Sequence, residues 1–181
     1  SKLLSGDAQG AQSDLVASLR LDPRPGEVWR ELGEAQLALG NRNGALLSMQ
    51  RAQRRQPDDV RVLERLGRLA LDRRDYELAA SVLGRLRQQD LEAVDPALPF
   101  IVGAQLGRSL TALGYVNAAL EPLSEAAELP ERFTQSTTRQ EALALVYRQR
   151  GDVWRDIGDA HARLGDVESA LEAYERAAIL P

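Results

Sequence analysis

The sequence has no cysteine, and His161 is its single histidine. The absence of cysteine excludes disulfide bonds and cysteine-based metal sites. Aromatic residues make up only 4%, and no run of 18 apolar residues is present, so we expect no membrane-spanning helix and no direct membrane insertion. The net charge of −4 argues against the strongly basic surface of a nucleic-acid-binding domain, so we expect no nucleic-acid partner.

What the sequence does contain favours helices. Hydrophobic residues make up 44% of the chain and charged residues 28%, which is typical of a globular protein. Alanine, leucine, arginine and glutamate are abundant, and β-branched residues are few, so we predict an all-α fold. Lys2 is the only lysine among 23 basic residues, a bias typical of GC-rich coding and hence of many bacteria. The compartment stays open between cytoplasm and periplasm.

A unit of about 34 residues recurs along the chain. Four glycines mark it, each preceded by a large apolar residue: Leu32-Gly33, Leu66-Gly67, Leu106-Gly107 and Ile157-Gly158. Other columns recur in the same register: Trp29, Leu63, Gly103 and Trp154; Gly40, Arg74, Gly114 and Gly165; Ala45, Ala79, Ala119 and Ala170; Met49, Leu83, Leu123 and Tyr174. Gly6, Ala11, Leu15 and Pro23 precede Gly40, Ala45, Met49 and Pro57 by 34 residues each. Such internal periodicity predicts a repeat architecture.

The pattern resembles the tetratricopeptide repeat, in which W-x-x-L-G is followed by alanine, a large apolar residue, alanine and proline. Its best copies span 26–57 and 151–181. The resemblance implies a right-handed α-solenoid of helix-turn-helix repeats whose first helices line a concave groove. It also implies binding of another protein.

We expect residues 1–181 to form a single solenoid. Its predicted parts are a partial repeat at 1–25, repeats at 26–59, 60–93, 100–133 and 151–181, and a helical insertion at 134–150. Thr138 and Glu141 form a capping-box pattern, which predicts one long helix from Thr138 to Leu164 with Gly151 inside it. Asp95-Pro96 predicts the start of a longer first helix in the third copy.

The small and large columns have a physical interpretation. Small residues such as Gly33 are expected to let the two helices of a pair approach closely. Large residues such as Trp29 and Trp154 are expected to be buried wedges. Gly40 and Gly165 stand where a helix must end, and glycine tolerates the left-handed conformation of such a cap.

The residues that catalysis requires are missing. His161 occupies a repeat column and is interpreted as a packed, hydrogen-bonded side chain. Asp152, Asp156 and Asp159 share one helix face, which we interpret as solvated and not as a metal site. We therefore predict no enzyme activity, no cofactor, no metal and no catalytic residue.

The outward residues of the first helices divide the groove into bands of charge, which are acidic, basic, mixed and acidic in the four copies. Glu27, Glu31 and Glu34 are acidic, and the three aspartates of the fourth copy are acidic too. The predicted partner-binding residues lie in the second and third copies: Arg61, Arg65, Arg68, Ile101, Ala104, Gln105, Arg108 and Thr111. Arginines beside an apolar floor favour a peptide or helix with acidic and apolar residues. Alternatively the bands pair with one another: Glu31 and Glu34 would occupy Arg65 and Arg68, and Asp159 would bind Arg108.

One subtype of the family binds the C-terminal carboxylates of a chaperone through lysines and asparagines. The corresponding columns here hold Arg30, Glu34, Arg65, Ile101 and Gln105. Only the charge of Arg30 matches, so this activity is not implied.

The leading hypothesis is a protein-binding scaffold. The alternative is a spacer or self-associating segment of a larger bacterial machine, such as a polysaccharide-export or pilus-assembly complex. We also expect the chain to be a fragment with raw ends, because Leu171, Tyr174 and Ile179 lack a covering neighbour. Such ends predict end-to-end self-association.

Overall fold

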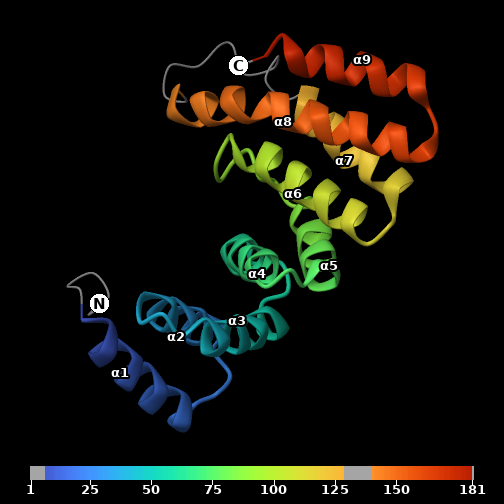
Figure 1. Cartoon of the computed structure of the whole chain (residues 1–181). Coiled ribbons are helices and arrows are strands. Elements are labelled where there is room, and N and C mark those ends of the chain that lie inside the picture. Colours follow the sequence, from blue (N-terminus) through green and yellow to red (C-terminus); the bar gives the residue numbers. More distant parts are fainter. Residues whose placement is uncertain (1–6, 129–139, 181) are drawn as a thin grey trace. The chain divides into compact units, whose positions relative to one another are not determined.

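The computed structural model of the protein describes residues 7–128 and 140–180. The described residues form nine α-helices, and none of them lies in a β-strand (Figure 1). The all-α prediction is therefore confirmed. The chain divides into two compact units, Ser1–Asp75 and Tyr76–Pro181, and each is described by itself. The division falls within the predicted repeat 60–93, and a single continuous solenoid stays a prediction.

The first unit contains α1 (Ala8–Leu21), α2 (Gly26–Ala38), α3 (Arg42–Arg55) and α4 (Val60–Asp72), each packed on the next. Its buried apolar residues include Leu32, Ala35, Ala45, Met49, Leu63 and Leu66. Asp7 and Asn41, which are 34 residues apart, both cap the N-terminus of a helix by accepting a backbone N–H. The repeat period is therefore visible in the starts of the helices as well as in the core.

The second unit contains α5 (Tyr76–Leu86), α6 (Leu98–Ala112), α7 (Val116–Glu128), α8 (Gln140–Leu164) and α9 (Val167–Ala178). Successive helices pack together, and α6 also contacts α8. The core joins α6, α7, α8 and α9 through Phe100, Leu123, Val146, Val153, Ile157 and Ala173. Each helix thus buries its apolar side against its neighbours in the chain, as stacked helix pairs must.

The predicted long helix is confirmed over its described part. α8 runs through the buried Gly151 to Leu164 without a break. Thr138, with its part in the predicted capping box, lies outside the described residues. α6 is longer than α2, as expected, but it begins at Leu98 and not at Asp95-Pro96. The reason is a turn in which the Asp95 carboxylate accepts the Ala97 N–H at 2.8 Å.

Gly40 and Gly165, predicted to end first helices, adopt a left-handed backbone, and so do Arg74 and Gly114 in the same repeat column. The φ angles are +75° at Gly40, +57° at Arg74, +87° at Gly114 and +79° at Gly165. In the first of these turns the Gly40 N–H donates to Leu37 O at 2.9 Å, and the next N–H donates to Gln36 O at 2.8 Å. This is the Schellman pattern, and it recurs at the other three. Only Arg74 pays a steric cost for it, because its Cβ crowds the backbone.

The predicted close approach of paired helices is also confirmed. A Cβ atom added to Gly33 would lie 2.8 Å from the Met49 side chain. In the later pairs, an added Cβ would lie 2.4 Å from Leu123 at Gly107 and 2.5 Å from Tyr174 at Gly158. The space that the glycine side chain leaves is therefore filled by the large residue of the next helix.

The wedge prediction for the tryptophans needs correction, because Trp29 and Trp154 are half-buried and not buried. An arginine lies over one face of each ring. The guanidinium of Arg51 lies 4.5 Å from the Trp29 ring centroid, and that of Arg176 lies 4.6 Å from the Trp154 ring centroid. The outer side of each ring therefore makes a cation–π contact, which leaves it partly accessible to water.

Candidate functional site

In the first unit, α4 presents the predicted arginines Arg61, Arg65 and Arg68 on the side away from its buried residues. Arg65 Nε donates to Glu34 Oε1 of α2 at 2.8 Å, so the pairing of this arginine across helices is confirmed. Arg68 is instead bound by Glu64, one turn earlier in its own helix, at 2.7 Å. The alternative in which Glu31 and Glu34 occupy both arginines is therefore wrong for Arg68.

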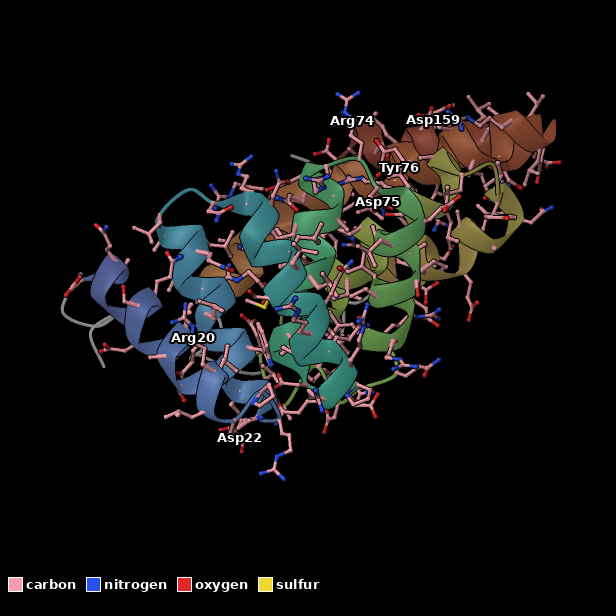
Figure 2. The ribbon with its side chains drawn as sticks, turned by 90° about the horizontal axis from the view of Figure 1, so that it is seen from below. Arg20, Asp22, Arg74, Asp75, Tyr76 and Asp159 are labelled. Atoms are coloured by element: carbon pink, nitrogen blue, oxygen red, sulfur yellow. The ribbon has the colours of Figure 1, made fainter. Side chains whose placement is uncertain are left out.

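In the second unit, α6 carries Arg108, whose Nε lies 2.6 Å from Asp156 Oδ2 of α8. The expectation that Asp159 binds this arginine is wrong, because the partner is Asp156, about one helical turn earlier in α8. Asp159, labelled on α8 in Figure 2, accepts a hydrogen bond from the Tyr174 hydroxyl at 2.8 Å instead. Asp152 pairs with Arg155 at 2.8 Å. The three aspartates thus serve three separate partners, and nowhere in the described ranges do three or more histidine, aspartate or glutamate side chains gather as for a metal ion.

Asp156 is the electrostatically perturbed group of this face. Burial raises the pKa of its carboxyl above the ordinary value of 3.8, and the Arg108 guanidinium opposes that rise. Asp159 and Asp152 add smaller upward contributions to the same pKa. The Arg108 guanidinium therefore favours the ionised form of a partly desolvated carboxylate.

The predicted apolar floor beside Arg108 is smaller than expected. Ala104 is 3% exposed and belongs to the core, so it is not available to a partner. Ile101 and Gln105 are half-buried. Thr111 is also half-buried, and its hydroxyl donates to Gly107 O of its own helix at 2.9 Å. The accessible apolar surface of the predicted site on α6 therefore centres on Ile101.

The predicted binding residues lie in both units, three on α4 and five on α6. Their convergence in one groove stays a prediction. Within each unit, every predicted arginine except Arg61 already has a carboxylate partner at 2.6–2.8 Å. Arg61 is exposed, and its side chain makes no ion pair with any residue that the structure describes.

His161 is packed and hydrogen-bonded, as the sequence predicted. Its side chain is 23% exposed, and Nδ1 lies 3.2 Å from Asp166 Oδ2. Asp166 caps the N-terminus of α9 by accepting the Ser169 N–H. The hydrogen bond with the Ser169 side chain is the main cause that lowers the pKa of Asp166, and the bond with the Ser169 backbone comes second. The histidine thus supports a helix cap.

Sequence reasoning missed an ion-pair cluster around Arg87, just after α5. Its guanidinium lies 2.9 Å from Glu121 and 2.8 Å from Glu125, both on α7. The hydrogen bond that Arg87 donates to Glu125 is the main cause that raises the pKa of Arg87. The available signal was the spacing of the two glutamates by one helical turn, but nothing in the sequence placed Arg87 opposite them.

No helix in the described part of the chain is both long and apolar enough to cross a membrane. The helix pairs within each unit, closed by the same left-handed turn, define a class of helical repeat proteins. The chain belongs to the tetratricopeptide repeat family, and family models described as tetratricopeptide repeat match residues 2–64 and 131–181.

Solved structures of MamA share this fold. "Crystal structure of MamA" is 19% identical with a TM-score of 0.63, and the match covers 98% of this chain and 90% of that one. "MamA AMB-1" is 21% identical with a TM-score of 0.69, and the match covers 96% of this chain and 82% of that one. MamA from Desulfovibrio magneticus RS-1 is 16% identical with a TM-score of 0.61, and the match covers 97% of this chain and 86% of that one. No curated protein sequence matches significantly. At these identities the likeness concerns the fold alone.

Proposed function

We propose that this chain is a protein-binding scaffold whose first-helix faces bind an acidic-and-apolar segment of another protein. The observation that supports this is the row on α4, where Arg61, Arg65 and Arg68 recur at helical spacing on one accessible face. A row of guanidinium groups presents fixed forks of N–H donors that match carboxylates in a bidentate manner. The scaffold binds and does not catalyse.

The existing ion pairs do not prevent such binding. Arg65 and Glu34 are each about one-third exposed, and Arg68 is more exposed still. Exposed pairs contribute only about 0–1 kcal/mol each, so a partner carboxylate can replace Glu34 or Glu64 at small cost. The acidic row on α2, with Glu27 and Glu31 exposed, would repel the same segment and help to fix its position.

On α6, Arg108 would have the same role toward a partner carboxylate, with Ile101 and Gln105 beside it. Ile101 is half-buried, so an apolar side chain of the partner could cover its remaining exposed surface. Asp156 holds Arg108 in place at 2.6 Å and keeps the guanidinium oriented. Ala104 supports this face from the core and is not a contact residue.

The test uses a library of fluorescein-labelled peptides rich in glutamate and leucine, with anisotropy as the readout. Arg61→Glu/Arg68→Glu should weaken the best binder at least about tenfold, because two attractive pairs become repulsive. Arg42→Glu/Arg54→Glu, which reverses two exposed arginines of α3, is the charge-matched control. Equal weakening in both variants would mean general charge attraction and would sink the proposal.

A second candidate function, self-association, is favoured by a specific observation on α9. Val167 and Leu171 of α9 are 75% and 59% exposed, and Ile179, at its C-cap, is 83% exposed. The residues of α7 in the repeat columns of Leu171 and Tyr174 are Leu120 and Leu123, and these pack in the core that α7 shares with α8. The exposed α9 face is thus as apolar as the α7 face that packs against α8.

A self-associating segment predicts that Leu171→Glu abolishes any oligomer seen by sedimentation velocity at high concentration. Glu172→Gln, on an exposed neighbour, serves as the control. A wild-type chain that stays monomeric across the concentration range would remove this candidate. The arginine variants of α4 separate it from the scaffold, because a spacer would not respond to them.

A further inference from the structure

One column of the repeat is occupied differently in the third copy. Trp29 and Trp154 hold this column in the first and fourth copies, and Gly103 holds it in the third. The arginine that covers each tryptophan ring stands 22 residues after it, and the residue 22 after Gly103 is Glu125. The third copy therefore has no aromatic ring in this column, and it has an anion where the first and fourth copies have the cation.

A cavity of about 440 Å³ lies at this place in the second unit, between the segment after α5 and helices α6 and α7. Its apolar lining comes from Leu91, Pro99, Pro122 and Ala126, together with Gly103. A Cβ atom on Gly103 would lie 2.8 Å from the Pro122 carbonyl oxygen, so the column has no room for a side chain of its own. The neighbouring helix therefore closes this column, and the cavity is the open space beside it.

The rim of the cavity is acidic. Four carboxylates line it, from Asp90, Glu92, Glu125 and Glu128, against the single guanidinium of Arg87. Arg87 is already held by Glu125 and by Glu121 of α7. Glu92 and Glu128 are exposed, and neither forms an ion pair within the described ranges. The rim therefore has excess negative charge above an apolar floor.

We propose that this cavity binds an arginine side chain of a partner protein. The floor of Leu91, Pro99 and Pro122 suits the aliphatic part of the arginine, which buries its methylenes while the charged end stays near water. The rim carboxylates suit its guanidinium, which is planar, weakly hydrated and able to bind two oxygens at once. In the first and fourth copies a guanidinium of the chain itself covers the equivalent column. In the third copy the partner supplies it.

This surface is distinct from the one proposed for acidic segments. Gly103 and Ile101 are two residues apart on α6, so they point in nearly opposite directions around the helix axis. The charges are also opposite, because Ile101 shares its side of α6 with Arg108 whereas Gly103 lines the same cavity as Glu125. A partner that used both surfaces would present acidic and basic segments to opposite sides of α6.

The test titrates N-acetyl-arginine amide into the full chain, isotopically labelled, and follows backbone amide shifts by NMR. Shift changes should be confined to the cavity, at Leu91, Gly103 and Ala126. Glu92→Gln/Glu128→Gln should raise the Kd about threefold to tenfold, since two exposed charge pairs are lost. Glu168→Gln/Glu175→Gln removes two exposed charges from α9 and should leave the Kd unchanged.

N-acetyl-lysine amide and N-acetyl-glutamine amide are the ligand controls. Weaker binding of lysine and no binding of glutamine are expected, because only arginine combines charge with a planar fork. Shifts scattered over the acidic surface, equal weakening by the α9 variant, or no arginine binding would each overturn the proposal. Failure here leaves the α4 proposal standing, because the two tests share no residue.

Discussion

Arg108 of α6 and Asp156 of α8 are joined by an ion pair of 2.6 Å across two helix pairs of the second unit. Asp156 is 29% exposed at its side chain, and burial raises the pKa of its carboxyl. The pair therefore acts mainly to compensate a desolvated charge, and its contribution to the free energy of unfolding depends on pH.

Arg108→Ala should destabilise the chain by about 1 kcal/mol at pH 7, because it leaves a partly buried carboxylate without its partner. The pKa of Asp156 lies above its unfolded value of 3.8, and the variant should raise it further. A raised carboxyl pKa means that protonation favours the folded state, so this contribution is fully present below 3.8 and is lost as pH rises through the folded pKa. The penalty of Arg108→Ala should therefore shrink from pH 7 toward pH 4. Urea unfolding at both pH values checks this, and a penalty independent of pH would contradict it.

Arg74→Gly should stabilise the first unit. Arg74 has a φ of +57°, which costs a residue with a Cβ roughly 1–2 kcal/mol. Glycine removes that strain but loses roughly 0.5–1 kcal/mol through its greater freedom when unfolded, so the net gain is about 0.5–1 kcal/mol. Gly40→Ala, at a φ of +75°, should change the free energy of unfolding in the opposite direction. Chemical denaturation of both variants measures the sign of each change in the free energy of unfolding.

Gly107→Ala should destabilise the chain by about 1–3 kcal/mol, because its Cβ would lie 2.4 Å from Leu123 and force the two helices apart. Gly84 is also helical, but an added Cβ meets nothing within 4 Å there. Gly84→Ala should therefore stabilise by up to about 1 kcal/mol through helix propensity alone. Thermal unfolding of this matched pair distinguishes close packing from propensity, and equal effects would contradict the close approach of α6 and α7.

Trp154→Ala should cost about 2–3 kcal/mol, less than the 3–5 kcal/mol typical of a fully buried tryptophan, because the ring is half-buried. Arg176→Ala should cost about 0.5–1 kcal/mol through loss of the cation–π contact at 4.6 Å. A double-mutant cycle between the two residues measures their coupling. A coupling near zero would mean that the arginine only rests on the ring.

The sequence by itself determined the repeated parts of this protein. The glycine column, the left-handed turns at Gly40, Gly114 and Gly165, and the long α8 were all predictable, because caps and close helix contacts depend on residue types at fixed spacing. The same regularity predicted the arginine row on α4, whose use in binding stays a proposal. Local pattern was sufficient for these caps and close contacts, but it did not predict the partial exposure of Trp29 and Trp154 or the start of α6.

Only the tertiary structure decided which charges meet. Arg108 pairs with Asp156 and not with Asp159, and Arg68 pairs within its own helix, because the choice depends on helix rotation and on a distance of one turn. The acidic cavity beside Gly103 was also hidden, since it is bounded by Leu91 and Glu92 from the irregular segment after α5, where the repeat is interrupted. Spacing along the chain fixes which residues share a face, but only packing fixes what lies opposite them.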